Sequence, residues 1–289
     1  MGRRILIAGC GYVGGALAAR LLEQGDEVFG LKRSPEGLDA RIHPIAADVT
    51  DPATLGALPR VDALVYAVSA GGRHEGAYRG AYLEGVRNVL SALERGPGLP
   101  SRTVFVSSTA VYAQDDDSWV DESSEVSGAR PTSRLLLEAE DEARQAKGAV
   151  VLRLSGLYGP GRHHLIRTVD EGQIATSDPY TNRIHRDDAA QAIALLLDQG
   201  RAGPLFIGTD DTPARLSEVR AYIAELLVRE RGAPLEAKAA EPLSAAGRSG
   251  SKRLSNARLR ALGFRPAYPS YREGYPEIVR GYVSRGPST

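Results

Sequence analysis

The sequence predicts an α/β protein built on a doubly wound parallel sheet. Apolar runs of strand length alternate with longer amphipathic stretches through the first two thirds of the chain. The first apolar run, at residues 4–8, leads directly into a glycine turn, and a helical apolar pattern follows that turn. Strands joined in this way need right-handed crossovers, which place helices on both faces of the sheet.

The glycine turn at residues 9–14 reads GCGYVG, the G-x-G-x-x-G pattern of a dinucleotide-binding turn. Gly9 permits the tight turn, Gly11 lets the backbone approach a pyrophosphate, and Gly14 lets the helix pack closely on the strand. The N-terminus of that helix offers free N–H groups to phosphates. An ordinary tight turn is the alternative, but the flanking strand and helix favour cofactor binding by these glycines together with Tyr12 and Val13.

The remaining elements follow in chain order. Strands are expected at 26–31, just before Ala47, and at 62–68, 103–108 and 149–154, with long helices at about 76–95 and 130–147. Past Gly156 the pattern loosens. There we expect a long loop with a helical insert (156–183), a helix (187–198), a short strand (204–208), a helix (215–229), a surface loop (232–250) and a last helix (256–262).

Composition excludes several classes of protein. The formal net charge is zero, so charge gives no reason to expect nucleic acid or an anionic membrane as a partner. The single cysteine, Cys10, allows no disulfide within the chain, which is typical of the cytoplasm. No apolar stretch has the length of a membrane helix, and residues 1–8 do not resemble a signal peptide. We therefore expect a cytoplasmic protein with a small-molecule partner.

A loop at residues 113–129 separates the fifth strand from the second long helix. It contains three consecutive acids, Asp115 to Asp117. Loops of this length are usually functional or disordered. A solvated acidic flap and a lid over a substrate are both consistent with its composition.

Five segments together resemble the extended short-chain dehydrogenase/reductase family of the nucleotide-sugar epimerase and dehydratase type. The resemblance covers most of the chain, and order and spacing make it specific. The segments are GCGYVG (9–14), SSTAVY (107–112), LRLSGLYGPGR (152–162), NRIHRDD (182–188) and SKRLSNARL (251–259).

The resemblance implies roles for matching positions on the cofactor side. Asp48 would contact the adenine, and Ala67 and Val68 would lie beneath the cofactor at the end of a strand. Ser108 matches the serine or threonine that holds the reacting oxygen of the substrate. Tyr158 would lie near the nicotinamide.

The resemblance also implies a substrate side, which would include Ser69, His163, Asn182 and His185. For His185, a histidine hydrogen-bonded in a strand-to-helix corner is the favoured alternative, and for His163 a solvated loop position. The implied architecture is a Rossmann fold with a small C-terminal substrate-binding subdomain. Residues 1–155 with parts of 182–208 would form the first part, and 156–181 with 209–289 the second.

One departure from the family concerns proton transfer. The family's acid/base pair is Tyr-x-x-x-Lys at the start of the second long helix, where this chain carries Arg130 and Arg134. Arginine stays protonated in proteins and cannot exchange a proton as a phenol does. Arg134 would instead hold the cofactor and Arg130 an anionic or carbonyl-bearing substrate. Tyr112, Tyr158 or a histidine of the pair 163–164 would donate the proton.

The end of the second strand predicts which cofactor is bound. NAD sites usually carry an acid there, whereas arginine accommodates the 2′-phosphate of NADP. This strand ends with Lys32, Arg33 and Ser34 and has no acid before Glu36. Charge-assisted bonds to phosphate are strong, so NADP is favoured over NAD, with an exposed basic turn as the alternative.

The sequence therefore predicts an NAD(P)-binding oxidoreductase or epimerase/dehydratase-like enzyme. Its substrate would be a small carbonyl or hydroxyl compound or a nucleotide-sugar-like molecule. A non-redox NADP-binding sensor or interaction protein, or a lyase that reuses the cleft, are the alternatives. The resemblance also implies a possible homodimer through the two long helices, although their outer faces are largely charged.

Overall fold

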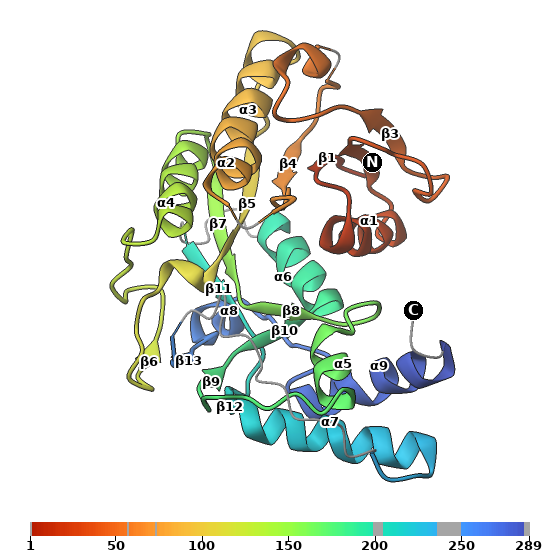
Figure 1. Cartoon of the computed structure of the whole chain (residues 1–289). Coiled ribbons are helices and arrows are strands. Elements are labelled where there is room, and N and C mark those ends of the chain that lie inside the picture. The colour runs from red at the N-terminus through yellow and green to blue at the C-terminus, as the bar shows by residue number, and fades with distance from the viewer. Residues whose placement is uncertain (1, 57, 73, 199–204, 236–249, 286–289) are drawn as a thin grey trace.

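A seven-stranded parallel sheet forms the centre of the computed structural model, which describes all residues except 1, 57, 73, 199–204, 236–249 and 286–289 (Figure 1). The strand order is β11-β7-β5-β4-β1-β2-β3. The chain builds outward from β1 to β3 and then returns to β4, so the predicted doubly wound sheet is confirmed. The strands are β1 (Arg4–Ala8), β2 (Glu27–Lys32), β3 (His43–Ala46), β4 (Ala63–Tyr66), β5 (Arg102–Ser108), β7 (Ala149–Leu154) and β11 (Leu205–Gly208).

The central strands are continuous apolar runs because helices cover both faces of the sheet. In β1, Ile5 and Ile7 pack into one core cluster and Leu6 and Ala8 into another, and all four side chains are inaccessible to solvent. This alternation follows from the two-residue period of a strand. The observed strands agree with the predicted ones to within about two residues.

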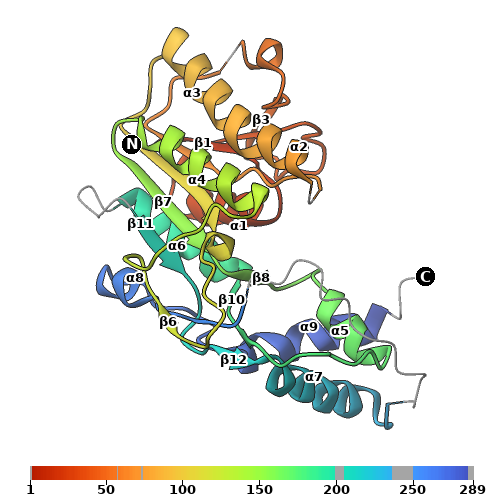
Figure 2. The same ribbon diagram turned by 60° about the vertical axis from the view of Figure 1, so that its left-hand side comes forward.

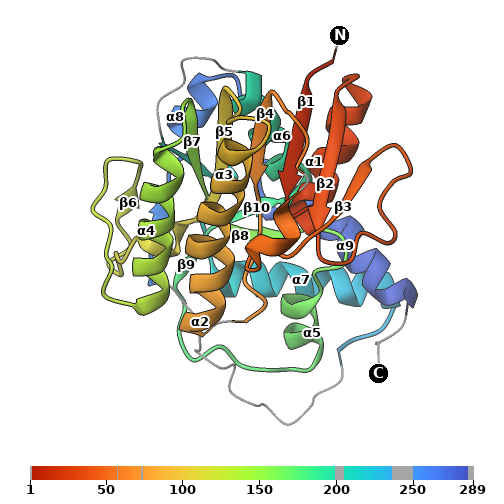
Figure 3. The same cartoon turned by 90° about the horizontal axis from the view of Figure 1, so that it is seen from above.

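Figure 3 shows the two helical layers with the sheet between them. Helices α1 (Tyr12–Glu23) and α6 (Arg186–Asp198) pack against each other on one face. Helices α3 (Gly85–Arg95) and α4 (Pro131–Arg144) cover the other face. The single helix expected at 76–95 is wrong in detail, because the chain forms α2 (Glu75–Tyr78), a π-helix η2 (Arg79–Glu84) and then α3.

Several helices that follow β7 in the chain lie beyond the carboxyl end of the sheet strands (Figure 2). Helices α5 (His164–Asp170), α7 (Leu216–Arg231) and α9 (Tyr271–Arg285) share one apolar cluster. The helix expected at 256–262 is present as α8 (Ala257–Ala261), but the prediction that it is the last helix is wrong, because α9 follows it. Gly274 and Pro276 lie inside α9 and conceal its helical pattern in the sequence. The expected loop 232–250 lies largely outside the described residues.

Short elements complete the chain. Three two-stranded pairs, β8 with β10, β9 with β12 and β6 with β13, connect the loops at the carboxyl end. Within the described residues, no helix has both the length and the apolar character that a membrane span needs. The short elements are η1 (Pro52–Leu55), η3 (Thr109–Val111), β6 (Trp119–Val120), β8 (Gly156–Tyr158), β9 (Tyr180–Thr181), β10 (Arg183–His185), β12 (Ala214–Arg215) and β13 (Arg253–Leu254).

Candidate functional site

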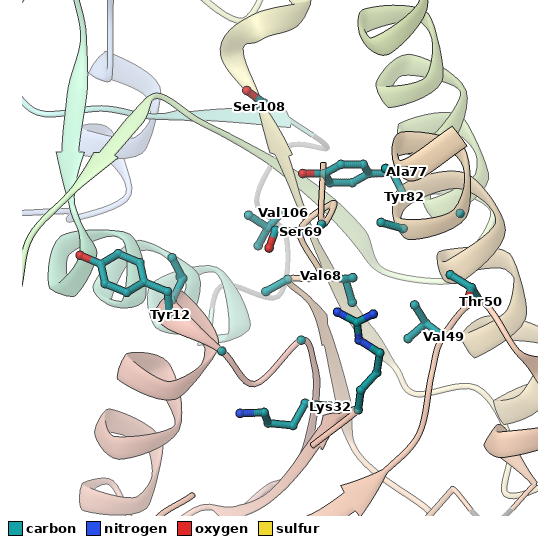
Figure 4. Close-up of a pocket in the computed structure, with 18 of the residues that line it drawn as sticks. Tyr12, Lys32, Val49, Thr50, Val68, Ser69, Ala77, Tyr82, Val106 and Ser108 are labelled. Atoms are coloured by element: carbon teal, nitrogen blue, oxygen red, sulfur yellow. The ribbon is translucent and has the colours of Figure 1, made fainter. Parts of the chain in front are cut away.

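A cleft of about 830 Å³ lies at the carboxyl edge of the sheet, where β1, β2, β4 and β5 end (Figure 4). In open α/β sheets, ligands bind at this edge, beside the point where the strand order reverses. Here that point lies between β1 and β4. The structure brings twelve of the predicted site residues to the cleft wall: Gly9, Gly11, Tyr12, Val13, Lys32, Arg33, Ser34, Asp48, Ala67, Val68, Ser69 and Ser108.

Each glycine of the turn has its own geometric reason. Gly9 has φ +91°, and a Cβ there would lie 2.5 Å from the Val68 backbone nitrogen. A Cβ at Gly14 would lie 2.4 Å from the Gly9 carbonyl oxygen, so a larger residue would push α1 away from β1. A Cβ at Gly11 would meet nothing within 4 Å. The turn thus exposes bare backbone to the cleft at the N-terminus of α1, as a pyrophosphate requires.

Two arginines pack against the ring of Tyr12. The guanidinium carbon of Arg162 lies 4.6 Å from the ring centroid and that of Arg186 lies 5.5 Å away. Both distances are within the range of cation–π attraction. Arg162 also lines the cleft, so this stack places a cation at the rim beside the glycine turn.

The end of the cleft beside β2 is cationic. Lys32, Arg33 and Ser34 line it, and Figure 4 shows Lys32 at the opposite end of the cleft from Ser108. Asp48 accepts hydrogen bonds from the Thr50 backbone nitrogen at 2.9 Å and from Thr50 Oγ1 at 2.8 Å. These bonds, with a smaller contribution from Arg33, lower the pKa of the Asp48 carboxyl. Asp48 is therefore ionised and oriented by its own loop.

Serine hydroxyls mark the end of the cleft where β5 stops. Ser108 caps η3 by accepting a hydrogen bond from the Ala110 backbone nitrogen at 3.2 Å, which leaves its own hydroxyl proton to donate. Ser69, just beyond β4, lines the same region. Ser107 also borders the cleft, but its hydroxyl donates to the buried Glu140 at 2.6 Å.

The two tyrosines predicted as proton donors do not line the cleft in the described structure. Tyr112 is fully buried, and its hydroxyl accepts a hydrogen bond from Arg153 at 2.8 Å. Tyr158 is buried in the apolar cluster of the C-terminal helices and donates to the Ser270 carbonyl at 3.2 Å. Burial raises the pKa of both hydroxyls. The prediction that either donates a proton to a substrate is therefore corrected: both hydroxyls are used inside the core.

The two arginines at the start of α4 also stand apart from the described cleft lining. Arg130 donates to the Ala110 carbonyl oxygen at 3.0 Å. Arg134 is 52% exposed and lies 3.8 Å from Glu75 and 3.9 Å from Glu138. The predicted roles of Arg130 on the substrate and of Arg134 on the cofactor are corrected for this reason.

Three residues predicted on the substrate side organise the fold. Asn182 donates to the Lys252 carbonyl at 2.9 Å and accepts from the Leu254 backbone nitrogen at 2.8 Å, so it holds the C-terminal tail. His185 is buried, and its ring centroid lies 3.8 Å from that of Tyr268. Its Nδ1 accepts a hydrogen bond from the Asp187 backbone nitrogen at 3.3 Å.

His163 packs on Tyr282, with ring centroids 5.5 Å apart. None of these three residues lines the cleft within the described chain. His185 is thus the corner histidine that the favoured alternative described.

The acidic loop 113–129 is tied to the rest of the protein. The Ser251 backbone nitrogen donates to Asp115 at 2.6 Å, and Arg215 pairs with Asp117 at 2.6 Å. The Ser251 hydroxyl also bonds Asp117. These bonds anchor the loop to the segment around Ser251, although Asp115 and Asp116 remain exposed to solvent.

Several side chains of the cleft wall were missed by sequence reasoning, among them His74, Tyr82 and Arg162. Arg162 ends the segment 152–162, one of the five on which the family resemblance rests, and it follows a Gly-Pro-Gly sequence. Nothing else in the sequence indicated that Arg162 belongs to the site. His74 and Tyr82 belong to the region of α2 and η2. A π-turn has no simple sequence pattern, so nothing indicated that Tyr82 would face the cleft.

Comparison with known proteins gives a consistent family. The model of the "NAD dependent epimerase/dehydratase family" matches residues 5–207. Protein YeeZ of Escherichia coli (strain K12) is 32% identical over 222 residues, which cover 71% of this chain and 76% of YeeZ.

Solved structures are similar over nearly the whole chain. One from Methylobacillus flagellatus, described as a "putative NAD-dependent epimerase/dehydratase", is 37% identical with a TM-score of 0.78, and the match covers 99% of this chain and 100% of that one. The human epimerase family protein SDR39U1 (isoform 2), solved with NADPH, has a TM-score of 0.75 over 96% of this chain and 100% of its own. At its 23% identity, the human match shows a shared fold.

Proposed function

The chain belongs to the NAD-dependent epimerase/dehydratase family, and we propose that it is an NADP-dependent oxidoreductase or epimerase/dehydratase-like enzyme. Its substrate is a small compound with a carbonyl or hydroxyl group, or a nucleotide-sugar-like molecule. One observation carries this proposal: a single cleft runs from the glycine turn to Ser108 and so joins a pyrophosphate site to a hydrogen-bond donor for a substrate oxygen.

The residues present fit a nicotinamide dinucleotide. The open space over Gly11 and the N-terminus of α1 suit the pyrophosphate, and Asp48 lies where an adenosine would end. Lys32, Arg33 and Ser34 suit a 2′-phosphate, which favours NADP. When bound, the nicotinamide supplies or accepts a hydride.

The chain's own residues orient the substrate. Ser108 donates its hydroxyl proton to the reacting oxygen, with Ser69 beside it. Leu157 and Arg162 border the cleft from the segment after β7. The family resemblance assigns substrate binding to residues 156–181 and 209–289 and the cofactor to 1–155 with parts of 182–208, and Leu157 and Arg162 belong to the first of these substrate ranges.

A second candidate is a sensor or interaction protein that binds NADP without redox chemistry. The positions of Arg130 and Arg134 outside the described cleft lining favour it, because neither arginine then replaces the family's proton-transfer pair. Binding of NADPH without any oxidation or reduction of carbonyl probes would support this candidate over the enzyme.

Cofactor preference tests the proposal. Arg33→Ala should weaken NADPH binding by about 10–150-fold, because a charge-assisted contact to phosphate contributes about 1.5–3 kcal/mol. NADH binding should change little, since NADH has no 2′-phosphate. Titration calorimetry on the purified protein measures both affinities.

Arg41→Ala is the matched control for this experiment. Arg41 lies in the same connection after β2 but is exposed and pairs with Asp39 at 2.7 Å. Its loss should leave both affinities unchanged. Equal affinity of the parent protein for NADPH and NADH would contradict the preference for NADP.

A further inference from the structure

The helix that follows β4 is interrupted by the π-helix η2. A π-turn inserts an extra residue into a helix and so changes the direction of the side chains around it, and such turns are frequent at functional sites. Tyr82 lies within this turn. Its direction is therefore set by an irregularity in the helix and not by the ordinary helical period.

Buried contacts hold the π-turn in place. The Tyr66 hydroxyl, at the end of β4, donates to the Ala81 carbonyl oxygen at 2.5 Å, and the Tyr66 side chain is inaccessible to solvent. Gly85 makes room for this bond, since a Cβ there would lie 2.2 Å from the Tyr66 hydroxyl oxygen. The sheet thus supplies a partner for a carbonyl inside the π-turn, next to Tyr82.

The side chain of Tyr82 reaches the cleft. It lines the cleft with Ser69, Val106 and Ser108. Figure 4 shows its ring extending from the helix, with the hydroxyl directed toward the side of the cleft that carries those three residues. Tyr78 packs behind it, with ring centroids 5.2 Å apart.

The hydroxyl of Tyr82 keeps its proton at neutral pH. Burial is the main cause that raises the pKa of Tyr82 to about 12, and the neighbouring Tyr78 adds to it. A hydrogen bond from the Ala70 backbone opposes the shift only in part. A phenol in this state is a donor, not a base, before the reaction begins.

Tyr12, the other phenol on the described cleft wall, is less suited to proton donation. The Tyr12 hydroxyl is buried, and a Cβ built on Gly159 would lie 2.8 Å from it, so it points into the protein behind the glycine turn. His74 has a structural role as the N-terminal cap of α2, because its Nδ1 accepts a hydrogen bond from the Ala77 nitrogen at 3.2 Å. Tyr82 is the phenol directed toward Ser108.

We propose that Tyr82 is the proton donor to the substrate oxygen that Ser108 holds, in place of the tyrosine that the family carries at the start of the next long helix. This inference rests on the proposed function. When bound, the reduced nicotinamide would supply a hydride to the substrate carbonyl carbon, and the π electron pair of the C=O bond would move to the oxygen. That oxygen takes the Tyr82 hydroxyl proton, and the phenolate recovers a proton from water.

Tyr82→Phe tests the inference, with Tyr78→Phe as the matched control. Tyr78 is the neighbouring tyrosine of the same helical segment but is not among the described residues of the cleft wall. With NADPH and a panel of simple ketones and aldehydes, Tyr82→Phe should lower kcat by about 10²–10⁴-fold. NADPH affinity should stay within about threefold of the parent. Tyr78→Phe should keep both values. A Tyr82→Phe variant with the parent's turnover overturns the inference.

A second readout does not depend on turnover. In protein labelled at tyrosine Cζ with ¹³C, the resonance missing from Tyr82→Phe identifies Tyr82. That resonance should differ between the NADP⁺ and NADPH complexes, because only the oxidised ring is positively charged, and the Tyr78 resonance should differ less. Identical Tyr82 resonances in the two complexes overturn the inference. A parent protein that binds neither cofactor overturns the proposed function instead.

Discussion

At the residue scale, two buried acids in this protein have opposite surroundings. Glu140 is inaccessible to solvent and is fully partnered: Arg153 donates to it at 2.7 and 2.9 Å, and Ser107 at 2.6 Å. Asp210 is 1% exposed, and its Oδ2 has no hydrogen-bond partner within the described structure. Removing one partner from a buried pair leaves an uncompensated charge, and Asp210 Oδ2 has no such partner within the described structure.

The pH dependence of stability should therefore reflect Asp210. Burial raises the pKa of its carboxyl to about 8, against the pull of Arg183, while the unfolded chain ionises it near 3.8. The folded state thus holds this proton more tightly. The resulting stabilisation is complete below about pH 4 and is lost as the pH rises to about 8, by at most about 1.4 kcal/mol per pH unit. Asp210→Asn should retain this stabilisation, because an amide does not ionise. In urea denaturation, the free energy of unfolding of the variant relative to the parent should therefore increase from pH 5 to pH 8.

One result of this measurement would contradict the protonated state of Asp210. If Asp210→Asn is less stable than the parent by the same amount at pH 5 and pH 8, the carboxylate is ionised throughout and pairs electrostatically with Arg183.

At the element scale, the α2–η2–α3 segment requires glycine at position 85, and its sequence alone does not indicate this. Gly85 lies against the Tyr66 hydroxyl, and a Cβ there would also approach a Val49 methyl at 2.8 Å. Both neighbours are buried, and Tyr66 cannot move without losing its bond to the π-turn. Local propensity alone would favour alanine over glycine in this helix by about 1 kcal/mol.

Gly85→Ala should therefore destabilise the protein by about 1–3 kcal/mol, as overpacking of a core does. Gly281→Ala in α9 is the matched control. A Cβ there meets nothing within 4 Å, so this change should stabilise the protein by up to about 1 kcal/mol. Urea denaturation measures both. A Gly85→Ala variant as stable as the parent would mean that Tyr66 can shift away from the added methyl group without loss of stability.

The elements also show why some features could be predicted and others not. The sheet and the glycine turn follow from patterns of a few consecutive residues, and these predictions agree with the structure. The positions of Arg130 and Tyr158 depend on packing between distant segments, such as the Tyr158 bond to the Ser270 carbonyl, so a sequence pattern could not place them. Helix α9 was missed because Pro276 breaks its local signal, although packing on α7 stabilises it.

At the scale of the whole molecule, the described cleft wall draws on segments between Gly9 and Arg162 of the chain. Gly11 and Lys32 come from the first two strand ends, whereas Leu157 and Arg162 come from the segment after β7. Asn182 in turn ties this region to the C-terminal tail. A molecule bound in the cleft would therefore contact several segments of the chain at once. Its binding should raise the free energy of unfolding of the whole protein.

Thermal unfolding with NADPH measures this coupling. A ligand that binds only the folded state at 100 times its Kd stabilises that state by about 2.7 kcal/mol, which corresponds to an increase in Tm of about 5 °C for a chain of this size. Gly11→Val should abolish the increase, because its side chain would occupy the space that the pyrophosphate needs. Gly15→Val, four residues along α1 and also in open space but outside the described cleft lining, should retain it. An equal increase in Tm for both variants would show that NADPH binds away from the glycine turn.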